Sequence, residues 1–209
     1  YYVLGNFRNF ARFIYEFLII TWLNKDTLDK FLVVENKYLL DKYVKYGKGV
    51  IVLTAHLGNW EWGAAMLAIL GYKPLVIAYP WVSPWIKKFY RKRRESVGME
   101  VVYIGEPMKR VLARLRRGGV IATLGDRAYT KQHVVEKFFG KPAKFPYGIF
   151  KLASHVGAYV LPAFCLREAD GIYHVYFEEP VTNLRDYIKV LERYIKKYFM
   201  QWYVYDQVW

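Results

Sequence analysis

The chain opens with hydrophobic positions that fit one face of an α-helix. In residues 10–23 the apolar side chains recur at spacings of three and four, as Phe10, Phe13, Ile14, Phe17 and Leu18. This spacing follows the 3.6-residue period of a helix. Arg12 and Glu16 lie four positions apart and can pair on its polar side. We expect an amphipathic helix within residues 1–24 that packs on the protein's own core, which is a commoner use of this pattern than insertion into a membrane.

After this segment, short apolar runs alternate along the sequence with helical patterns. Residues 49–55 (GVIVLTA) are continuously apolar and rich in β-branched side chains, which is typical of a strand covered on both faces. Further strands are expected at residues 74–78, 99–104 and 120–124. Helices are expected at residues 60–70, 84–96, 108–117 and 181–200. Two more strands, residues 158–166 and 172–178, form a predicted hairpin around Asp170 and Gly171.

This order predicts the fold class. Three successive strand-helix-strand crossings imply a largely parallel, mixed sheet with helices on both faces, the α/β class. The 209 residues contain no internal repeat and no linker, and they suffice for a full core. We therefore expect a single domain over residues 1–209.

Charge and aromatic content narrow the choice of partner. The chain has 32 Lys and Arg against 18 Asp and Glu, a net charge of +14, which indicates an anionic partner. Seven Trp and 20 Tyr favour a membrane surface over nucleic acid, for which no recognised motif is present. No run reaches the ~18 apolar residues of a spanning helix. The single cysteine, Cys165, lies in an apolar run, so we expect a buried thiol in a reducing compartment.

Candidate chemistry follows the first confident strand. Residues 54–61 (TAHLGNWE) begin at its carboxyl end, where ligands bind in open α/β sheets. If His56 lies in a turn made possible by Gly58 and capped by Asn59, then Glu61 in the first helical turn can accept from one ring nitrogen. The other nitrogen can then take a proton from a hydroxyl group. The alternative is a structural histidine; zinc is disfavoured because no HExxH pairing occurs, and no metal is expected.

These residues carry a family resemblance. The segment GKGVIVLTAHLGNWE (residues 47–61) resembles the signature of the lysophospholipid acyltransferase superfamily, in its lipid A biosynthesis (lauroyl/myristoyl) acyltransferase branch. That branch includes phosphatidylinositol mannoside acyltransferases. The resemblance extends to residues 5–16, 138–148, 157–167 and the tryptophan-rich end, residues 201–209.

The resemblance implies a glycerolipid acyltransferase-like fold and a reaction. A fatty acyl group would pass from acyl carrier protein or coenzyme A to a hydroxyl of a glycolipid or lysolipid, with His56 as general base, Glu61 as its partner and no cofactor. The implied place is the cytoplasmic face of the bacterial inner membrane, where the protein is peripheral or held by an anchoring segment that this chain lacks. The alternative is a catalytically silent lipid-binding module, against which the retention of both residues argues.

The same resemblance points to further site residues. Asp126 and Arg127 form a GDR sequence close to that of the mannoside-type members, in some of which a later acidic residue pairs with the histidine. Asp126 or Glu136 can therefore share or take over the role of Glu61. With Asn59, Asp126 and Arg127 are expected to bind substrate.

The last candidate is a basic helix. Six cations fall within eight residues, Lys87, Lys88, Arg91, Lys92, Arg93 and Arg94. Such a run is commonly a solvated face, but aromatic side chains interleave with it here. It can also bind headgroup phosphates, acceptor phosphates or the donor. Because the family uses an arginine in this segment, Arg91 or Arg94 is our expected substrate contact.

Overall fold

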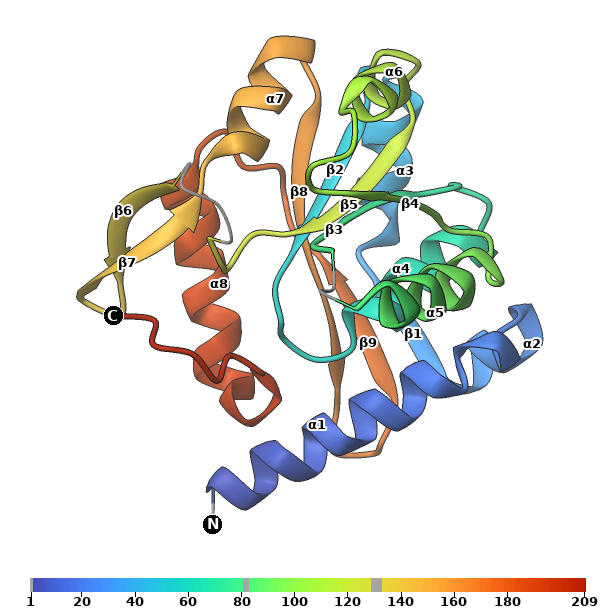
Figure 1. The fold of residues 1–209 in the computed structure, drawn as a ribbon, viewed down its shortest axis with the longest axis vertical. Coiled ribbons are helices and arrows are strands. Elements are labelled where there is room, and N and C mark those ends of the chain that lie inside the picture. The colour runs from blue at the N-terminus through green and yellow to red at the C-terminus, as the bar shows by residue number, and fades with distance from the viewer. Residues whose placement is uncertain (1, 81–82, 129–132) are drawn as a thin grey trace.

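The computed structural model describes residues 2–80, 83–128 and 133–209, which form an α/β domain (Figure 1). Its helices are α1 (Tyr2–Leu18), α2 (Lys25–Phe31), α3 (Lys37–Lys45), α4 (Trp60–Ile69), α5 (Pro84–Glu95), α6 (Lys109–Arg116), α7 (Gly148–Val156) and α8 (Leu184–Tyr198), with short 3₁₀ turns η1 (Ile20–Trp22) and η2 (Phe199–Gln201). Its strands are β1 (Leu32–Glu35), β2 (Val50–Thr54), β3 (Leu75–Ala78), β4 (Glu100–Tyr103), β5 (Val120–Leu124), β6 (His133–Phe138), β7 (Lys141–Pro146), β8 (Tyr159–Arg167) and β9 (Tyr173–Phe177).

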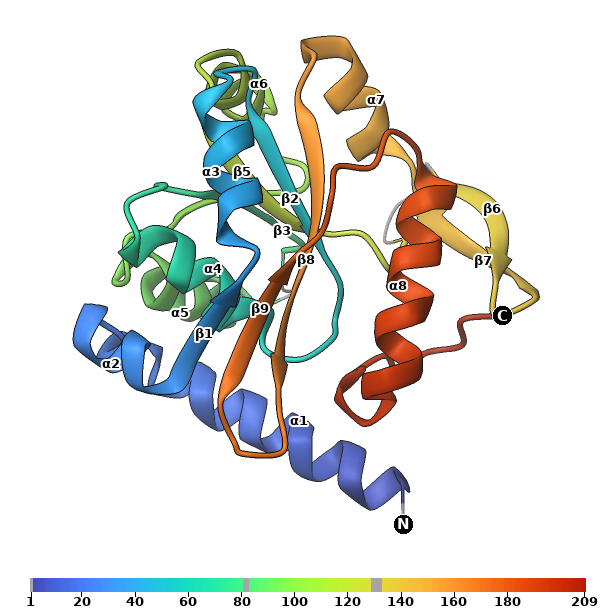
Figure 2. The ribbon, with the colours of Figure 1, turned by 180° about the vertical axis from the view of Figure 1, so that it is seen from behind.

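The described strands form a main sheet in the order β1-β9-β8-β2-β5-β3-β4. All neighbours in it are parallel except β8 and β9, which form the expected antiparallel hairpin. Helices α3 and α4 lie on one face, and α6, α7 and α8 lie on the other (Figure 2). The predicted class, a largely parallel mixed sheet flanked by helices on both faces, is confirmed.

The central strand β2 shows why this sheet needs cover on both sides. Val50 and Val52 join the core beneath α4, whereas Ile51 and Leu53 join the core beneath α8. All four side chains are at most 5% exposed. Since successive side chains of a strand point to opposite faces, a continuous apolar run is what a doubly covered strand requires.

Several elements were not predicted from the sequence. The segment α2-β1-α3 was unassigned because β1 has only four residues and becomes a strand by pairing with β9. The small β6-β7 sheet carries lysines and prolines that weaken a strand pattern. Its turn uses Phe139 and Gly140, both with positive φ, as a tight hairpin requires. Helix α7 was also missed.

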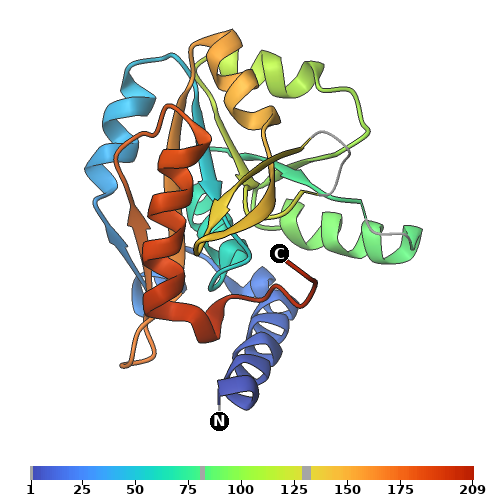
Figure 3. The same ribbon diagram turned by 90° about the vertical axis from the view of Figure 1, so that its left-hand side faces the viewer.

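Helix α1 begins and ends earlier than the expected residues 10–23, and it lies across one end of the domain (Figures 1 and 3). It buries Phe13, Glu16 and Phe17, and Phe17 joins the core that contains Val50 and Val52. The expected Arg12–Glu16 ion pair does not form, because the Glu16 carboxylate turns into the core, where Asn59 and Tyr173 donate to it. None of the described helices combines the length and apolar character that crossing a membrane demands.

Candidate active site

The turn between β2 and α4 positions His56. Gly58 adopts a φ of +68°, and a Cβ there would lie 2.0 Å from the Cys165 carbonyl oxygen, so this close approach requires glycine. Asn59 N–H donates to that same oxygen at 2.7 Å. From the C-terminal segment, Tyr203 N–H donates to the His56 carbonyl at 2.7 Å. Strand β8 and the C-terminal segment therefore hold the turn on both sides.

His56 pairs with Asp126. Its Nδ1 lies 2.9 Å from Asp126 Oδ1, and its backbone N–H donates to Oδ2 at 3.0 Å. The two residues meet because β2 and β5 are parallel neighbours, so the segments that follow them leave the same edge of the sheet. Of the two later carboxylates considered from the sequence, Asp126 occupies the partner position. Glu136, on β6, instead accepts from Arg185 of α8 at 3.1 Å.

The Asp126 carboxylate is held in its ionised form. Burial opposes its charge, but the His56 ring, the His56 backbone N–H and the Trp202 indole N–H, 3.1 Å from Oδ2, outweigh burial and lower the pKa of Asp126. An ionised carboxylate only accepts hydrogen bonds. In the neutral imidazole the His56 proton therefore belongs on Nδ1, and Nε2 is the nitrogen that can accept a proton.

Glu61 does not take the place expected for it. Its carboxylate accepts from Arg94 Nε at 3.0 Å and from Arg94 Nη2 at 2.6 Å, in a bidentate pair. Glu61 is 3% exposed and Arg94 is 7% exposed. The expected His56–Glu61 hydrogen bond is thus replaced by His56–Asp126, because the first turn of α4 directs Glu61 toward α5. The pair joins the helix after the turn to the basic helix.

Asn59 is a positioning residue in this structure. It is fully buried, its Oδ1 caps α4 by accepting from Trp62 N–H at 3.0 Å, and its Nδ2 donates to Glu16 at 2.8 Å. The Glu16 carboxylate also accepts from the Tyr173 hydroxyl at 2.7 Å. Both amide atoms of Asn59 are thus engaged inside the protein, and the expected contact of Asn59 with substrate stays a prediction.

Arg91 and Arg127, which were also expected to contact substrate, have internal partners as well. Arg91 Nη2 lies 3.2 Å from Glu106, and its Nη1 donates to the Val101 carbonyl at 3.3 Å. Arg127 forms an ion pair with Asp206 near the chain end. Arg91 therefore joins α5 to β4, and a contact of Arg91, Arg94 or Arg127 with substrate stays a prediction.

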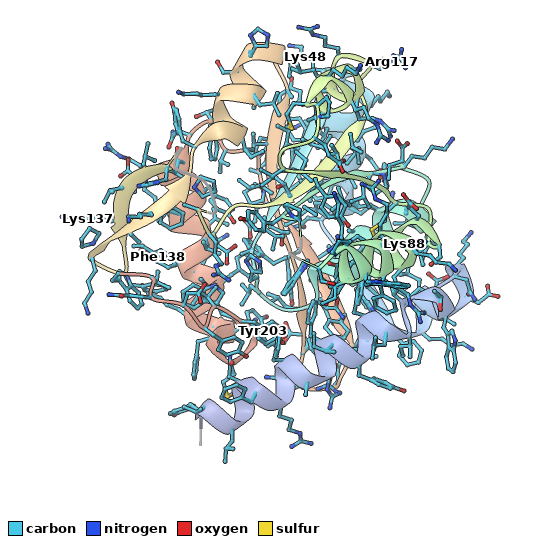
Figure 4. All side chains as sticks on the ribbon, in the orientation of Figure 1. Lys48, Lys88, Arg117, Lys137, Phe138 and Tyr203 are labelled. Atoms are coloured by element: carbon cyan, nitrogen blue, oxygen red, sulfur yellow. The ribbon has the colours of Figure 1, made fainter. Side chains whose placement is uncertain are left out.

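Two aromatic contributions escaped the sequence-based assignment of site residues. Trp60 packs edge-to-face on the His56 ring at 5.2 Å, and Phe13 of α1 packs on Trp60 at 4.1 Å between centroids. Trp202 reaches Asp126 from the far end of the chain. Tyr203 lies beside α1, between it and the end of α8 (Figure 4). Only the tryptophan-rich ending hinted at this role, since contacts across such separations leave no local pattern.

The site can provide a general base, the His56 imidazole, whose orientation Asp126 fixes. The His56 side chain remains 14% exposed, whereas that of Asp126 is fully buried. A hydroxyl group that reached Nε2 could give up its proton there. Among the described residues, no three His, Cys, Asp or Glu side chains gather closely enough to hold a metal ion.

Comparison with known proteins gives a consistent set of relatives. The family described as bacterial lipid A biosynthesis acyltransferase matches residues 3–205. A phosphatidylinositol mannoside acyltransferase of Mycobacterium tuberculosis (strain ATCC 25618 / H37Rv) is 32% identical over 139 residues, which are 63% of this chain and 43% of that protein. Its counterpart from Mycolicibacterium smegmatis (strain ATCC 700084 / mc(2)155) is 32% identical over 132 residues, 60% and 42% of the two chains. The chain thus spans less than half the length of these curated relatives.

Proposed function

From the premise that this chain belongs to the bacterial lipid A biosynthesis acyltransferase family, we propose that it moves a fatty acyl group from an acyl thioester to a hydroxyl of a glycolipid or lysolipid. The donor is acyl carrier protein or coenzyme A. The acceptor class rests on the related mannoside acyltransferases, whose names specify a glycolipid substrate.

In the proposed reaction His56 acts as the general base. Nε2 takes the proton of the acceptor hydroxyl while its oxygen attacks the thioester carbonyl carbon. The tetrahedral intermediate then collapses, the carbon–sulfur bond breaks, and the departing thiolate receives the proton from the imidazolium. Asp126 fixes the ring tautomer and stabilises the imidazolium, which is the orienting role of a carboxylate in a catalytic triad.

A single observation carries this proposal: the 2.9 Å contact between His56 Nδ1 and a buried, ionised Asp126 at the carboxyl edge of the parallel sheet. A histidine that only filled the core would need neither a lowered carboxylate pKa nor residual exposure. Glu61 serves the same reaction indirectly, by holding α4 and α5 together through Arg94.

We further place the reaction at the cytoplasmic face of the inner membrane, with the protein bound peripherally. Exposed apolar side chains gather on α1, on η1 and on the start of α5, among them Leu4, Phe7, Trp22 and Trp85. Basic residues of α5 flank them. Apolar anchors beside cations are typical of proteins that bind anionic bilayers.

The test is acyl transfer by His56→Ala, with His155→Ala as the matched control. His155 lies on α7, is exposed and does not border the proposed site. With acyl carrier protein and coenzyme A thioesters as donors, removal of the base should lower turnover by about 10²- to 10⁴-fold. The control should keep its activity. Near-normal turnover by a folded His56→Ala protein would overturn the mechanism.

A further inference from the structure

A second concave site lies beside α1, apart from the His56–Asp126 pair. This site, the α1 groove, has a volume of about 790 Å³ and runs between α1, η1 and α2 on one side and the β8-β9 hairpin on the other. The volume falls in the range of roughly 300 to 1,000 Å³ that small-molecule sites occupy. Neither His56 nor Asp126 lines it.

Most of the α1 groove is apolar and its rim is aromatic. Ile19, Leu23 and Trp62 contribute to its walls. At the rim, Tyr15 is 60% exposed and Trp22 is 72% exposed. Apolar walls of this kind accept a hydrocarbon chain, and exposed Trp and Tyr side chains are enriched where proteins meet lipid headgroups.

Two cations give the α1 groove a charged end. Arg12 of α1 and Arg167 of β8 both line it, and neither has an ion-pair partner among the described residues. Both line the groove together with Glu16, and both guanidinium groups favour the charged form of that carboxylate. Glu16 itself is turned toward Asn59 and Tyr173, which occupy its Oε2. The two arginines are therefore available to an outside anion.

We propose that the α1 groove binds an anionic membrane phospholipid, with its phosphate between Arg12 and Arg167 and one acyl chain along Ile19 and Leu23. Charge complementarity selects this occupant: the protein offers two arginines, the usual bidentate partners of phosphate, next to an apolar channel. The exposed apolar face of α1 continues from the rim of the groove, as a site filled from a bilayer requires. The bound lipid would hold α1 at the membrane independently of the reaction at His56.

The test measures binding of lipid monomers without any acyl donor. The probes are 1-oleoyl-lysophosphatidylglycerol, which is anionic, and 1-oleoyl-lysophosphatidylcholine, which is zwitterionic, both below their micelle concentrations. We expect saturable binding with a preference of at least about tenfold for the anionic lipid. Arg12→Gln/Arg167→Gln should weaken binding of the anionic lipid about 10- to 100-fold and abolish the preference, because charge-assisted hydrogen bonds are lost.

Matched variants separate the α1 groove from general charge. Arg8→Gln/Arg117→Gln removes the same two charges from exposed positions on α1 and after α6, and it should bind within about twofold of the unmodified protein. Arg12→Lys/Arg167→Lys keeps the charge and should retain the preference. Ala11→Trp fills the groove from its α1 side, keeps the charge, and should weaken binding of both lipids.

Three results would overturn the proposal. They are equal affinity for the two lipids, unchanged binding by both Arg12→Gln/Arg167→Gln and Ala11→Trp, or dimerisation that these variants abolish without any lipid bound. The last result would assign the groove to a second copy of the chain. Because no donor is present, a failure of acyl transfer in separate assays leaves this outcome untouched, and lipid binding does not by itself support catalysis.

Discussion

Arg94 donates to both carboxylate oxygens of Glu61, and both side chains are buried between α5 and α4. This relationship explains two features of the sequence together. Glu61, the last residue of the HxxxxE pattern, neutralises a buried arginine. Arg94, one of the six clustered cations, can be buried because Glu61 balances its charge. The pair fixes the basic helix to the helix that begins beside His56.

Breaking this pair on one side should destabilise the protein. Glu61→Ala leaves the Arg94 guanidinium buried without its partner, which typically costs about 3 to 5 kcal/mol in the free energy of unfolding. Glu61→Leu/Arg94→Met replaces both charges with apolar groups and should recover most of that loss. Urea denaturation measures both. We expect the double variant also to regain acyl transfer, since His56 takes its partner from Asp126. A stable but inactive double variant would assign a role in the reaction to Glu61 or to Arg94.

Asp126→Asn should lower acyl transfer by about 10²- to 10⁴-fold, because an amide neither enforces the Nδ1–H tautomer nor stabilises the imidazolium. Steady-state kinetics with a defined donor and acceptor give this number. Glu136→Gln is the matched control, since Glu136 of β6 pairs with Arg185 of α8, and it should keep nearly full turnover. Equal losses in the two variants would contradict the assignment of Asp126.

Glu16 should make stability depend on pH. Burial, the largest influence, raises the pKa of Glu16 above its ordinary value of 4.5, although Tyr173 and Asn59 oppose the shift by hydrogen bonding. The folded protein therefore holds this proton more tightly than the unfolded chain does. Its contribution to stability is complete below the ordinary value and is lost as pH rises through the raised pKa.

Glu16→Gln, which is neutral at every pH, should remove this dependence. Relative to the unmodified protein, the free energy of unfolding of the variant should increase as pH rises from about 5 to about 9. Denaturation at a series of pH values measures the difference. Glu95→Gln, at an exposed position on α5, should leave the dependence in place. A difference that shrinks with rising pH would contradict the direction given for the Glu16 pKa.

Membrane binding should depend on anionic lipid and weaken with salt, since each Lys or Arg near such a surface contributes about 1 kcal/mol. Lys88 on α5 and Lys137 on β6 are both exposed and lie on opposite sides of the molecule (Figure 4). Lys88→Glu should reduce flotation with anionic vesicles, whereas Lys137→Glu should not. Equal flotation with neutral and anionic vesicles would show that the basic residues do not attract the protein to anionic lipid.

The sequence by itself determined the elements whose patterns are local. The run around Val52 must be covered on both faces, and α8 follows from the 3.6-residue period. Helix α4, which is apolar nearly all round, is marked by its ends, Asn59 and Gly71. The sequence also placed His56 in a turn at a strand's carboxyl end, because Gly58 and Asn59 mark that turn. By contrast, β1 was invisible, since its strand conformation depends on pairing with β9, whose first residue lies far along the chain.

The partners of the charged residues were decided by the tertiary structure alone. His56 and Glu61 are close in sequence, yet the direction of the first turn of α4 turns Glu61 toward Arg94. Asp126, 70 residues away, reaches His56 because β2 and β5 are parallel neighbours. Local spacing states which residues can meet within one element. A buried carboxylate must find its partner wherever the packing brings one, because leaving it unpaired away from water costs too much free energy.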